Sequence, residues 1–350
     1  MTPPRVGIVL AVHNGEHHLA AARTQVEALT DPDLQLLLVD DASTDSTSET
    51  LRTWARDDPR ATLLRNSTRT GVAGARNRAL DHVTADYVWF TDCDDEWSPD
   101  ITARLSERAR RTDADVVVCD AWTRRADRTT RTPLGEPLQE NATEPVDAFR
   151  RLLRGELQGH LWNKLFRREL FEARGHRPAV RFPATRAHSD LAGVATLLAR
   201  SQRTELLDER LYTYVLREGS ILNSRETRTR DLLDVRDHVR AQVEGLRSEH
   251  PGHRDELRDD LLLFEYRFVY LALLNDAIRR DRREHAGRGP CASRDARSAI
   301  TLGGLLRLSR HGRLGVAAPA AAVKFAYPLY AAAYTAYRRR KWGTVGFGAS

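Results

Sequence analysis

The stretch DYVWFTDCDDEWSPD, residues 86–100, runs from an apolar segment directly into a cluster of acids. Its apolar part, Tyr87–Thr91, predicts a buried β-strand. Asp92, Asp94 and Asp95 follow at the point where that strand would end. Ligands of open α/β sheets bind beyond the carboxyl ends of the strands, so this junction predicts a sheet and a ligand site together.

Apolar runs of strand length flank this stretch on both sides and alternate with segments of helical character. The predicted strands are Val6–Val12, Leu34–Val39, Ala61–Arg65 and Val116–Cys119. Four helices are predicted. Two of them end near Leu29 and Arg56, and the other two cover residues 71–82 and 99–111. This alternation favours an α/β sheet with right-handed crossovers.

Two further polar clusters follow strands of the same predicted sheet: His13-Asn14-Gly15 after the first strand, and Asp40-Asp41 at the end of the second. A single acidic pair is usually a helix cap or a solvated turn. Three polar clusters at strand ends of one sheet would instead converge on one crevice. Crowded carboxylates repel one another and need a cation, and oxygen ligands suit Mg²⁺ or Mn²⁺. The sequence has no GxxxxGK[ST] loop, so we expect the metal and arginines such as Arg76 and Arg78 to neutralise phosphate charge.

Beyond the fifth predicted strand the pattern changes twice. Residues 120–142 are polar and predict a hairpin or a surface loop, and residues 146–223 form a second α/β-like stretch. The remainder is mainly helical in its apolar spacing. We therefore expect a catalytic domain at residues 1–225 and a helical accessory region at residues 226–350.

The helical region ends in an unusual tail. It begins with helical spacing at 228–247 and 255–283, followed by a linker-like segment at 288–297. Residues 302–336 are largely apolar, are interrupted by two prolines and a lysine, and lead into the basic run Arg338–Lys341. A membrane span needs about 20 uninterrupted apolar residues. The tail therefore fits either a peripheral membrane helix with a basic anchor or a helix pair packed on the catalytic domain.

Composition argues against several classes of protein. The chain is 41% hydrophobic and 30% charged, as in ordinary globular proteins. Its net charge of +6 suggests anionic partners. The arginines are spread along the chain, however, without the clustering expected of a nucleic-acid-binding protein. Three cysteines without CxxC spacing argue against a disulfide framework or a zinc site. The N-terminal apolar run predicts a strand and no signal peptide, so we expect a cytoplasmic protein.

The motifs, in their order, resemble those of family 2 glycosyltransferases with the GT-A fold. The resemblance covers about residues 5–223 and rests on IVLAVHNGEHHL (8–19), VDDASTDST (39–47), GVAGARNRAL (71–80), DYVWFTDCDDEWSPD (86–100), GHLWNKLFRRELFE (159–172) and YTYVLREGSI (212–221). It implies a GT-A nucleotide-binding sheet flanked by helices, with a helical C-terminal extension. It also implies an inverting, metal-dependent enzyme that moves a sugar from a nucleotide diphosphate, with a UDP-sugar favoured, to a hydroxyl acceptor.

The resemblance assigns the donor side of this chemistry. Asp40 would hydrogen-bond the nucleotide base, and His13 would stack on it where the family often has Tyr. Asp92 would contact the ribose, and Arg76 would assist in binding the nucleotide. Asp94 would bind the Mn²⁺ or Mg²⁺ that bridges the diphosphate.

An inverting transferase needs one general base for the acceptor hydroxyl. The family supplies an aspartate from a Glu-Asp pair, and the matching stretch here is AHSDL at residues 187–191. Asp190 is the candidate base, although Ser189 stands in place of the family's Glu. His188 is the reserve candidate, because its ordinary pKa suits base chemistry. The alternative is that Asp190 caps the following helix.

Three more residues are assigned to the acceptor side or to the diphosphate. Trp162 and Lys164 would line the acceptor side, with Trp162 equally suited to the core. Arg217 would reach the diphosphate, since a guanidinium suits phosphate oxygens, or would form a surface salt bridge.

The resemblance implies a glycan, polyol-phosphate or lipid-linked acceptor, and bacterial cell-surface polysaccharide or teichoic-acid-type glycan synthesis as the setting. The enzyme would then work at the inner face of the cell membrane. Two alternatives remain: a non-catalytic relative that binds sugar nucleotides, and a nucleotidyltransferase on a similar sheet. The second would need a Gly-rich phosphate loop, whereas only Gly15 follows the first strand.

Overall fold

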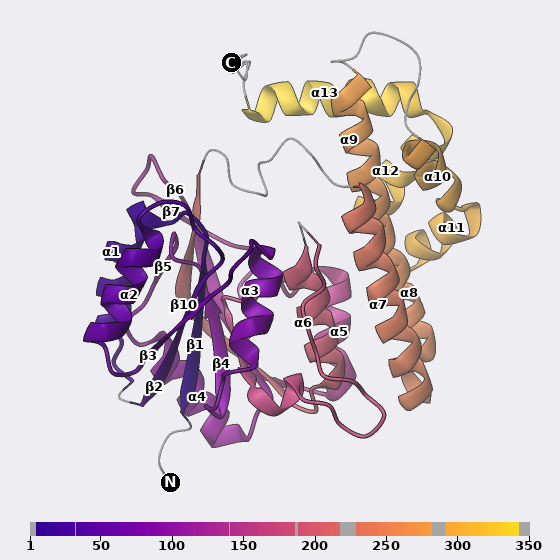
Figure 1. The fold of residues 1–350 in the computed structure, drawn as a ribbon. Coiled ribbons are helices and arrows are strands. Elements are labelled where there is room, and N and C mark those ends of the chain that lie inside the picture. Colours follow the sequence, from indigo (N-terminus) through magenta and orange to yellow (C-terminus); the bar gives the residue numbers. More distant parts are fainter. Residues whose placement is uncertain are drawn as a thin grey trace. The chain divides into compact units, whose positions relative to one another are not determined.

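The computed structural model describes residues 5–31, 33–139, 141–185, 188–217, 229–281 and 291–342. The chain divides into two compact units, Met1–Ser224 and Arg225–Ser350 (Figure 1). The N-terminal unit carries every side chain that the sequence assigned to chemistry, and the C-terminal unit is helical where it is described.

The N-terminal unit is built on one mixed sheet of ten strands in the order β3-β2-β1-β4-β9-β6-β10-β5, with β7 beside β6 and β8 beside β10. The strands are β1 (Val6–Val12), β2 (Leu34–Asp40), β3 (Ala61–Arg65), β4 (Tyr87–Thr91), β5 (Glu96–Trp97), β6 (Val116–Arg125), β7 (Arg131–Pro133), β8 (Asn141–Thr143), β9 (Lys164–Arg167) and β10 (Thr204–Leu216). Strands β3, β2, β1 and β4 are parallel neighbours, whereas β9 runs antiparallel to β4 and β6. The predicted α/β sheet is confirmed, with its first four strands matching the predicted ranges to within one residue.

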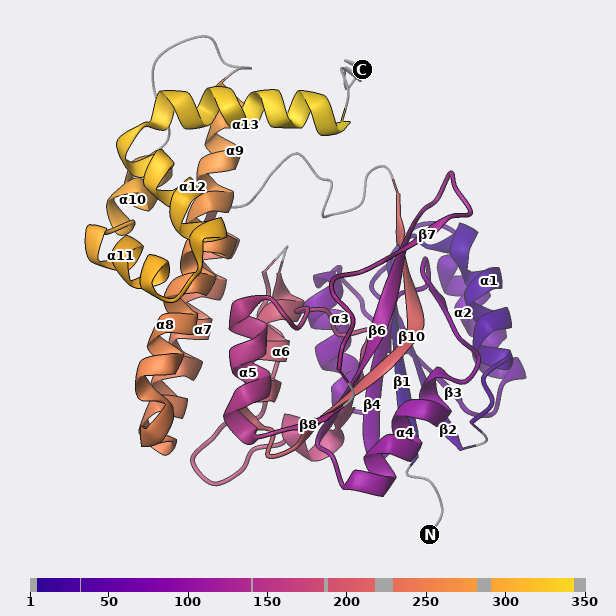
Figure 2. The ribbon, with the colours of Figure 1, turned by 180° about the vertical axis from the view of Figure 1, so that it is seen from behind.

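Helices cover both faces of this sheet, with α1 and α2 on one face and α3 on the other (Figures 1 and 2). The helices of this unit are α1 (Glu16–Glu27), α2 (Thr47–Asp57), α3 (Gly71–Leu80), α4 (Ile101–Thr112), α5 (Pro145–Arg154), η1 (Arg168–Phe171) and α6 (Ser189–Arg200). Within β1, Ile8 and Leu10 share a core cluster with Leu19 of α1 and Trp54 of α2. Side chains alternate along a strand, so Val9, which is also buried, faces the α3 side. Burial on both faces explains why β1 is an unbroken apolar run.

One predicted strand is longer than its sequence suggested. Residues 120–142 looked like a hairpin or loop after a strand ending at Cys119, but β6 continues to Arg125. Its polar end pairs with β10 in parallel and with β7 in antiparallel register. The hairpin is therefore confirmed, and the strand boundary is corrected because ladder pairing extends a strand through residues that carry no apolar signal.

The C-terminal unit is a set of helices packed on their own core. They are α7 (Thr229–Glu249), η3 (Pro251–His253), α8 (Arg254–Phe264), the π-helical η4 (Glu265–Tyr270), α9 (Leu271–Asp281), α10 (Cys291–Ala299), α11 (Leu302–Arg310), α12 (Leu314–Phe325) and α13 (Tyr327–Trp342). The linker predicted at 288–297 is wrong from Cys291 onward, because α10 buries Ala296 and is followed by the buried Ile300. Among the helices that the structure describes, none is both long and apolar enough to traverse a bilayer.

Asp41 lies directly after β2, at the edge of the sheet where the predicted site lies, and links that strand end to α3. Its buried carboxylate accepts hydrogen bonds from Asn66 Nδ2 at 2.7 Å, the Thr70 backbone N–H at 2.9 Å, Thr70 Oγ1 at 2.8 Å and the Gly71 N–H at 2.7 Å. Gly71 begins α3, so the carboxylate also meets the positive end of that helix. Burial alone would raise the pKa of Asp41, but these hydrogen bonds hold it below its ordinary value. Asp41 therefore fixes α3 to the end of β2.

We predict that Asp41→Ala lowers the free energy of unfolding by about 3 kcal/mol, because several buried donors lose a charged acceptor at once. Urea denaturation measures the loss. Asp127→Ala is the matched control, since Asp127 is an exposed aspartate paired with Arg125, and its substitution should change stability by less than about 0.5 kcal/mol. Equal stability of Asp41→Ala and the wild type would contradict this account.

Candidate active site

The turns after β1 and β2 lie side by side, as the sequence predicted. The Asp41 N–H donates to the Val12 carbonyl at 2.8 Å, His13 Nδ1 lies 2.9 Å from the Asp41 carbonyl, and the Asn14 N–H donates to Ser43 Oγ at 3.0 Å. A Cβ on Gly15 would lie 2.6 Å from Val12 Cγ1 and 3.3 Å from Cys93 Sγ. The glycine thus lets the β1 turn approach the acidic cluster after β4, and the three strand ends converge.

Asp40 lies beneath this surface rather than on it. Its fully buried carboxylate accepts hydrogen bonds from the Ser43 N–H at 2.9 Å and from Ser48 Oγ, and lies 3.3 Å from Arg65 Nε. Burial opposes ionisation, but these hydrogen bonds hold the pKa of Asp40 below its ordinary value. Before Asp40 could contact a nucleotide base as predicted, the side chain of Ser48 or Arg65 would therefore have to move off its carboxylate.

Arg76 joins the acidic cluster to the candidate base. From α3, its Nη2 donates to Asp92 Oδ1 at 3.1 Å and its Nη1 to Asp190 Oδ1 at 2.5 Å. The arginine side chain is only 4% exposed. The sequence placed Arg76 on the nucleotide; the structure shows both ends of its guanidinium on carboxylates.

The carboxylates after β4 point in different directions. Asp92 meets Arg76, while Asp94, which is 43% exposed, lies 2.9 Å from Arg217 Nη1. Burial, followed by repulsion from Asp190 and Asp94, raises the pKa of Asp92 to about 6, although Arg76 opposes the rise. Negative charge at this loop is therefore incompletely balanced by the protein.

Asp95 turns inward and holds the loop to β10. Its buried carboxylate accepts hydrogen bonds from Tyr212 Oη at 2.9 Å and from the Val215 N–H at 2.8 Å. Burial, with repulsion from Asp92, raises its pKa to about 8. The short β5 also pairs with β10. These contacts bring Arg217, two residues beyond Val215, to Asp94.

The donor set suits a hard cation. Asp92 and Asp94 offer carboxylate oxygens at one loop, and Mg²⁺ is commonly held by one or two carboxylates together with substrate phosphates. Among the described residues, no group of three His, Cys, Asp or Glu side chains is placed to hold a metal by itself. The residues therefore fit a metal that is completed by the diphosphate, rather than a closed protein cage.

Asp190 lies in the first turn of α6, with its carboxylate turned to Arg76. Besides that ion pair it accepts a hydrogen bond from Ser189 Oγ at 3.3 Å. The cap of α6 is His188, which has a positive φ of 65° and makes no side-chain capping hydrogen bond. Asp190 is therefore not the cap of α6, and its carboxylate pairs with Arg76 instead.

Trp162 and Lys164 are both buried. Trp162 is stacked between Tyr212, with ring centroids 4.4 Å apart, and His160, at 4.7 Å. Lys164 Nζ donates to the Gln158 and His160 carbonyls and to Asn163 Oδ1, each at 2.7 Å. Burial lowers the pKa of this lysine to about 7. The structure therefore favours the core alternative for Trp162. The acceptor-side position expected for Lys164 is corrected, because its buried ammonium group instead holds the loop 158–163 through hydrogen bonds.

His160 is a residue that the sequence reasoning missed. It is partly exposed, lies flat on Trp162, and is flanked by the partly exposed Tyr214, with ring centroids 6.1 Å apart. Burial and the charge of Lys164 lower its pKa to about 4, so the imidazole is neutral near pH 7. A Cβ on the preceding Gly159 would lie 3.2 Å from the Cα of Leu191, so the loop packs against the start of α6 beside Asp190. The GHLWNK motif contains His160, but nothing in its spacing distinguishes that histidine from the tryptophan.

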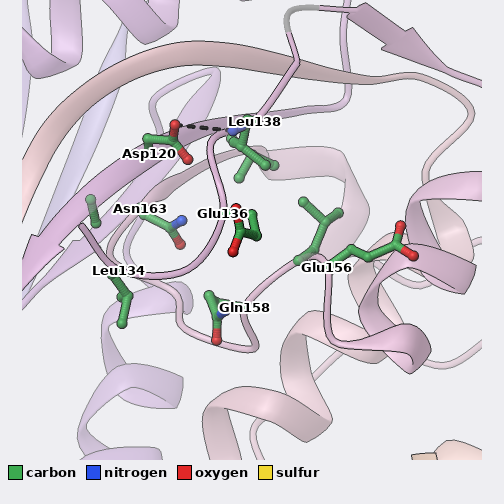
Figure 3. Close-up of a pocket in the computed structure, with 10 residues that line it drawn as sticks. Asp120, Leu134, Glu136, Leu138, Glu156, Gln158 and Asn163 are labelled. Atoms are coloured by element: carbon green, nitrogen blue, oxygen red, sulfur yellow. Dashed lines mark hydrogen bonds between the residues drawn. The ribbon is translucent and has the colours of Figure 1, made fainter. Parts of the chain in front are cut away.

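Figure 3 shows a cavity that Gln158 and Asn163, at the two ends of this loop, help to line. It is lined by residues including Asp120, Leu138, Gln158 and Asn163, and the Leu138 N–H donates to Asp120 Oδ2 at 3.1 Å. Its volume of about 10 Å³ is close to the space that one water molecule needs. It therefore cannot hold a nucleotide, and it contains none of the predicted site residues.

Comparisons with known proteins agree with this geometry. Residues 7–175, a little under half of the chain, match the sequence model for glycosyl transferase family 2. The chain is 27% identical over 214 residues to the uncharacterized glycosyltransferase EpsJ of Bacillus subtilis, a match that covers 60% of this chain and 61% of that protein. The chain thus spans less than two thirds of this relative's length.

Two solved structures have a similar fold. S. aureus TarS 1–349, in complex with UDP-GlcNAc, matches with a TM-score of 0.69 at 17% identity, over 96% of this chain and 92% of that one. The mannosyltransferase PcManGT of Pyrobaculum calidifontis, in complex with GDP-Man and Mn²⁺, matches with a TM-score of 0.54 at 19% identity, over 97% of this chain and 89% of that one. At these identities the likeness concerns the fold, which confirms the GT-A prediction.

We predict that Arg76→Met and Asp190→Asn are energetically coupled. Without Arg76, Asp92 and Asp190 lose their shared cation, so Arg76→Met should lower the free energy of unfolding by about 3 kcal/mol. In the Asp190→Asn background the loss should be smaller by about 1 kcal/mol or more. A double-mutant cycle by urea denaturation measures the coupling, with Arg56→Met on the exposed side of α2 as the uncoupled control. Losses that add within about 0.5 kcal/mol would show that the pair is not coupled.

Proposed function

We propose that this chain is an inverting glycosyltransferase that takes a sugar from a nucleotide diphosphate, because residues 7–175 match the model for glycosyl transferase family 2 and the N-terminal unit has the GT-A fold. One observation carries the proposal. Arg76 holds Asp92, in the acidic loop assigned to the donor, and Asp190, assigned to the acceptor, on the two ends of one guanidinium. A binding protein has no need for that juxtaposition, whereas a transferase must bring donor and base together.

The donor lies, in this proposal, over the ends of β1, β2 and β4. Asp92 contacts the ribose, and His13, partly exposed at the β1 turn, stacks on the base. Asp94, with Asp92 beside it, would hold Mn²⁺ or Mg²⁺, which when bound offsets the charge of the leaving diphosphate. Arg217 adds a second cation at the same place. A UDP-sugar is the favoured donor, supported by the likeness to TarS, which binds UDP-GlcNAc.

The acceptor side is proposed to centre on Asp190. The acceptor hydroxyl oxygen attacks the anomeric carbon as the bond from that carbon to the diphosphate oxygen breaks, and the hydroxyl proton passes to the Asp190 carboxylate. Attack from the face opposite the leaving group inverts the anomeric centre. Arg76 holds the carboxylate in place through its ion pair with Asp190 and is a positioning residue. His160 and Tyr214 offer flat faces on which an acceptor sugar can stack.

The proposal also covers the acceptor and the place where the enzyme works, and it is set against two alternative functions. The acceptor is a glycan, polyol-phosphate or lipid-linked hydroxyl in bacterial cell-surface glycan synthesis, and the enzyme works in the cytoplasm at the inner face of the membrane. A nucleotidyltransferase is disfavoured because the β1 turn has only Gly15 where a phosphate loop would be. A non-catalytic sugar-nucleotide-binding relative is separated from an enzyme by measuring donor hydrolysis with Mn²⁺.

We predict that donor binding requires the metal and Asp94. A panel of nucleotide sugars with Mn²⁺ should contain one that raises the melting temperature, equivalent to about 2.7 kcal/mol at a hundredfold excess over its Kd. EDTA and Asp94→Ala should each remove the shift, because the diphosphate then lacks the metal that offsets most of its charge. Asp127→Asn, in the exposed β6–β7 turn, is the matched control and should keep it. Full transfer in EDTA would refute the metal role.

We predict that two substitutions separate the chemical step from acceptor binding. Asp190→Asn should keep the donor-induced thermal shift but lower kcat by about 10²- to 10⁴-fold, since the proton has no acceptor. His160→Ala should leave kcat nearly unchanged and raise the acceptor KM about tenfold, which corresponds to one lost stacking contact. Steady-state kinetics with the donor from the panel measure both. Wild-type turnover by Asp190→Asn would remove it as the base.

A further inference from the structure

The end of the chain has a one-sided charge. Asp295 is the last acidic residue in the sequence, and the 55 residues after it contain nine Lys and Arg side chains. The chain has a net charge of +6, so residues 1–295 carry a net charge of −3 and residues 296–350 carry +9. All of the protein's excess positive charge therefore resides in this segment, which forms the end of α10 and all of α11, α12 and α13 where it is described.

The same helices expose large apolar side chains. Within the described part of the chain, six large hydrophobic residues are more than half exposed, and all of them lie in this segment: Leu302, Leu306, Leu314, Phe325, Leu329 and Tyr337. Solvent-facing helix surfaces are normally polar. A concentration of exposed apolar side chains on one set of helices marks an interaction surface.

Helix α13 shows the pattern most clearly. Its exposed positions between residues 328 and 337 follow helical spacing and are all apolar: Pro328, Leu329, Ala332, Ala333, Ala336 and Tyr337. The other side is held within the C-terminal unit, where Tyr330 Oη donates to Asn275 Oδ1 of α9 at 2.8 Å. The Arg297 guanidinium lies 5.1 Å from the centre of the Tyr327 ring, at the start of the same helix. The apolar stripe is therefore fixed facing outward, and the sequence continues from it directly into Arg338–Lys341.

We propose that α11–α13 form a peripheral binding surface for anionic phospholipid membranes. The apolar stripe would lie at the boundary between headgroups and acyl chains, and the cations would contact phosphate and anionic headgroups. A bilayer surface combines an apolar interior with a negative surface, and this segment complements both. A second copy of the chain would bring two copies of this positively charged segment together, and like charges disfavour that contact.

This inference deepens the proposed function, because it names the surface through which the enzyme would stay near a membrane-linked acceptor. It does not depend on the chemistry of the N-terminal unit. Membrane binding and donor binding are therefore measured on different units of the chain.

The test is co-sedimentation of the full chain with vesicles of phosphatidylcholine alone or with 30 mol% phosphatidylglycerol. The wild type should bind the anionic vesicles at least tenfold more tightly, and 0.5 M NaCl should reduce that binding. Phe325→Gln/Leu329→Gln should weaken it at least tenfold, because both side chains are exposed and their loss removes apolar contact. Arg310→Gln/Arg313→Gln should weaken it by roughly fivefold per charge.

The control is Arg52→Gln/Arg56→Gln, which removes the same charge from exposed positions on α2 and should bind vesicles like the wild type. Each variant should keep the wild-type unfolding transition and the thermal shift given by UDP with Mn²⁺. Equal binding of the wild type to both vesicle types, or unchanged binding of the tail variants, would overturn the proposal. So would a concentration-dependent dimer that Phe325→Gln/Leu329→Gln dissociates. Loss of the UDP shift in the wild type would instead count against the proposed donor function alone.

Discussion

The ion pairs of Arg76 with Asp92 and Asp190 are the constraint on which the site depends. A guanidinium that is almost fully buried is tolerated only where carboxylates satisfy it, and here it has one on each side. Arg76 comes from α3, Asp92 from the end of β4 and Asp190 from the start of α6. Three elements from distant parts of the chain are thereby joined through one guanidinium, by contacts of 3.1 Å and 2.5 Å. Removing Arg76 would leave the Asp92 and Asp190 carboxylates without their shared cation.

The other contacts of the site extend this arrangement outward. Asp41 fixes the start of α3 to the end of β2 and thereby positions the backbone of Arg76, which lies in α3. Asp95 fastens the acidic loop to β10, which brings Arg217 to Asp94. Gly159 lets the aromatic loop pack against the beginning of α6. Adjacent carboxylates at the end of one strand thus do different work, because one faces the core, one faces Arg76 and one faces solvent.

The C-terminal unit follows a different rule. Its inner helix faces bury apolar side chains, as expected, yet α11–α13 also leave apolar side chains exposed and contain no acidic residue of their own. Hydrophobic burial explains the first fact but not the second. A partner that is both apolar and negatively charged accounts for both with one physical cause, which is why a lipid surface fits better than a protein partner of either character alone.

The sequence by itself determined the parallel half of the sheet, because unbroken apolar runs that end in polar clusters mark buried parallel strands and their ligand edge. The order of its motifs indicated the resemblance to family 2 glycosyltransferases. The sequence also singled out Asp92, Asp94 and Asp190. It misjudged β6 and α10, where ladder pairing and a one-sided apolar face outweigh local composition. Only the tertiary structure decided that Lys164 and Trp162 are buried, that His160 is partly exposed, and that Arg76 meets two carboxylates. Those facts depend on which side chains from distant segments meet, and neither residue spacing nor composition encodes such meetings.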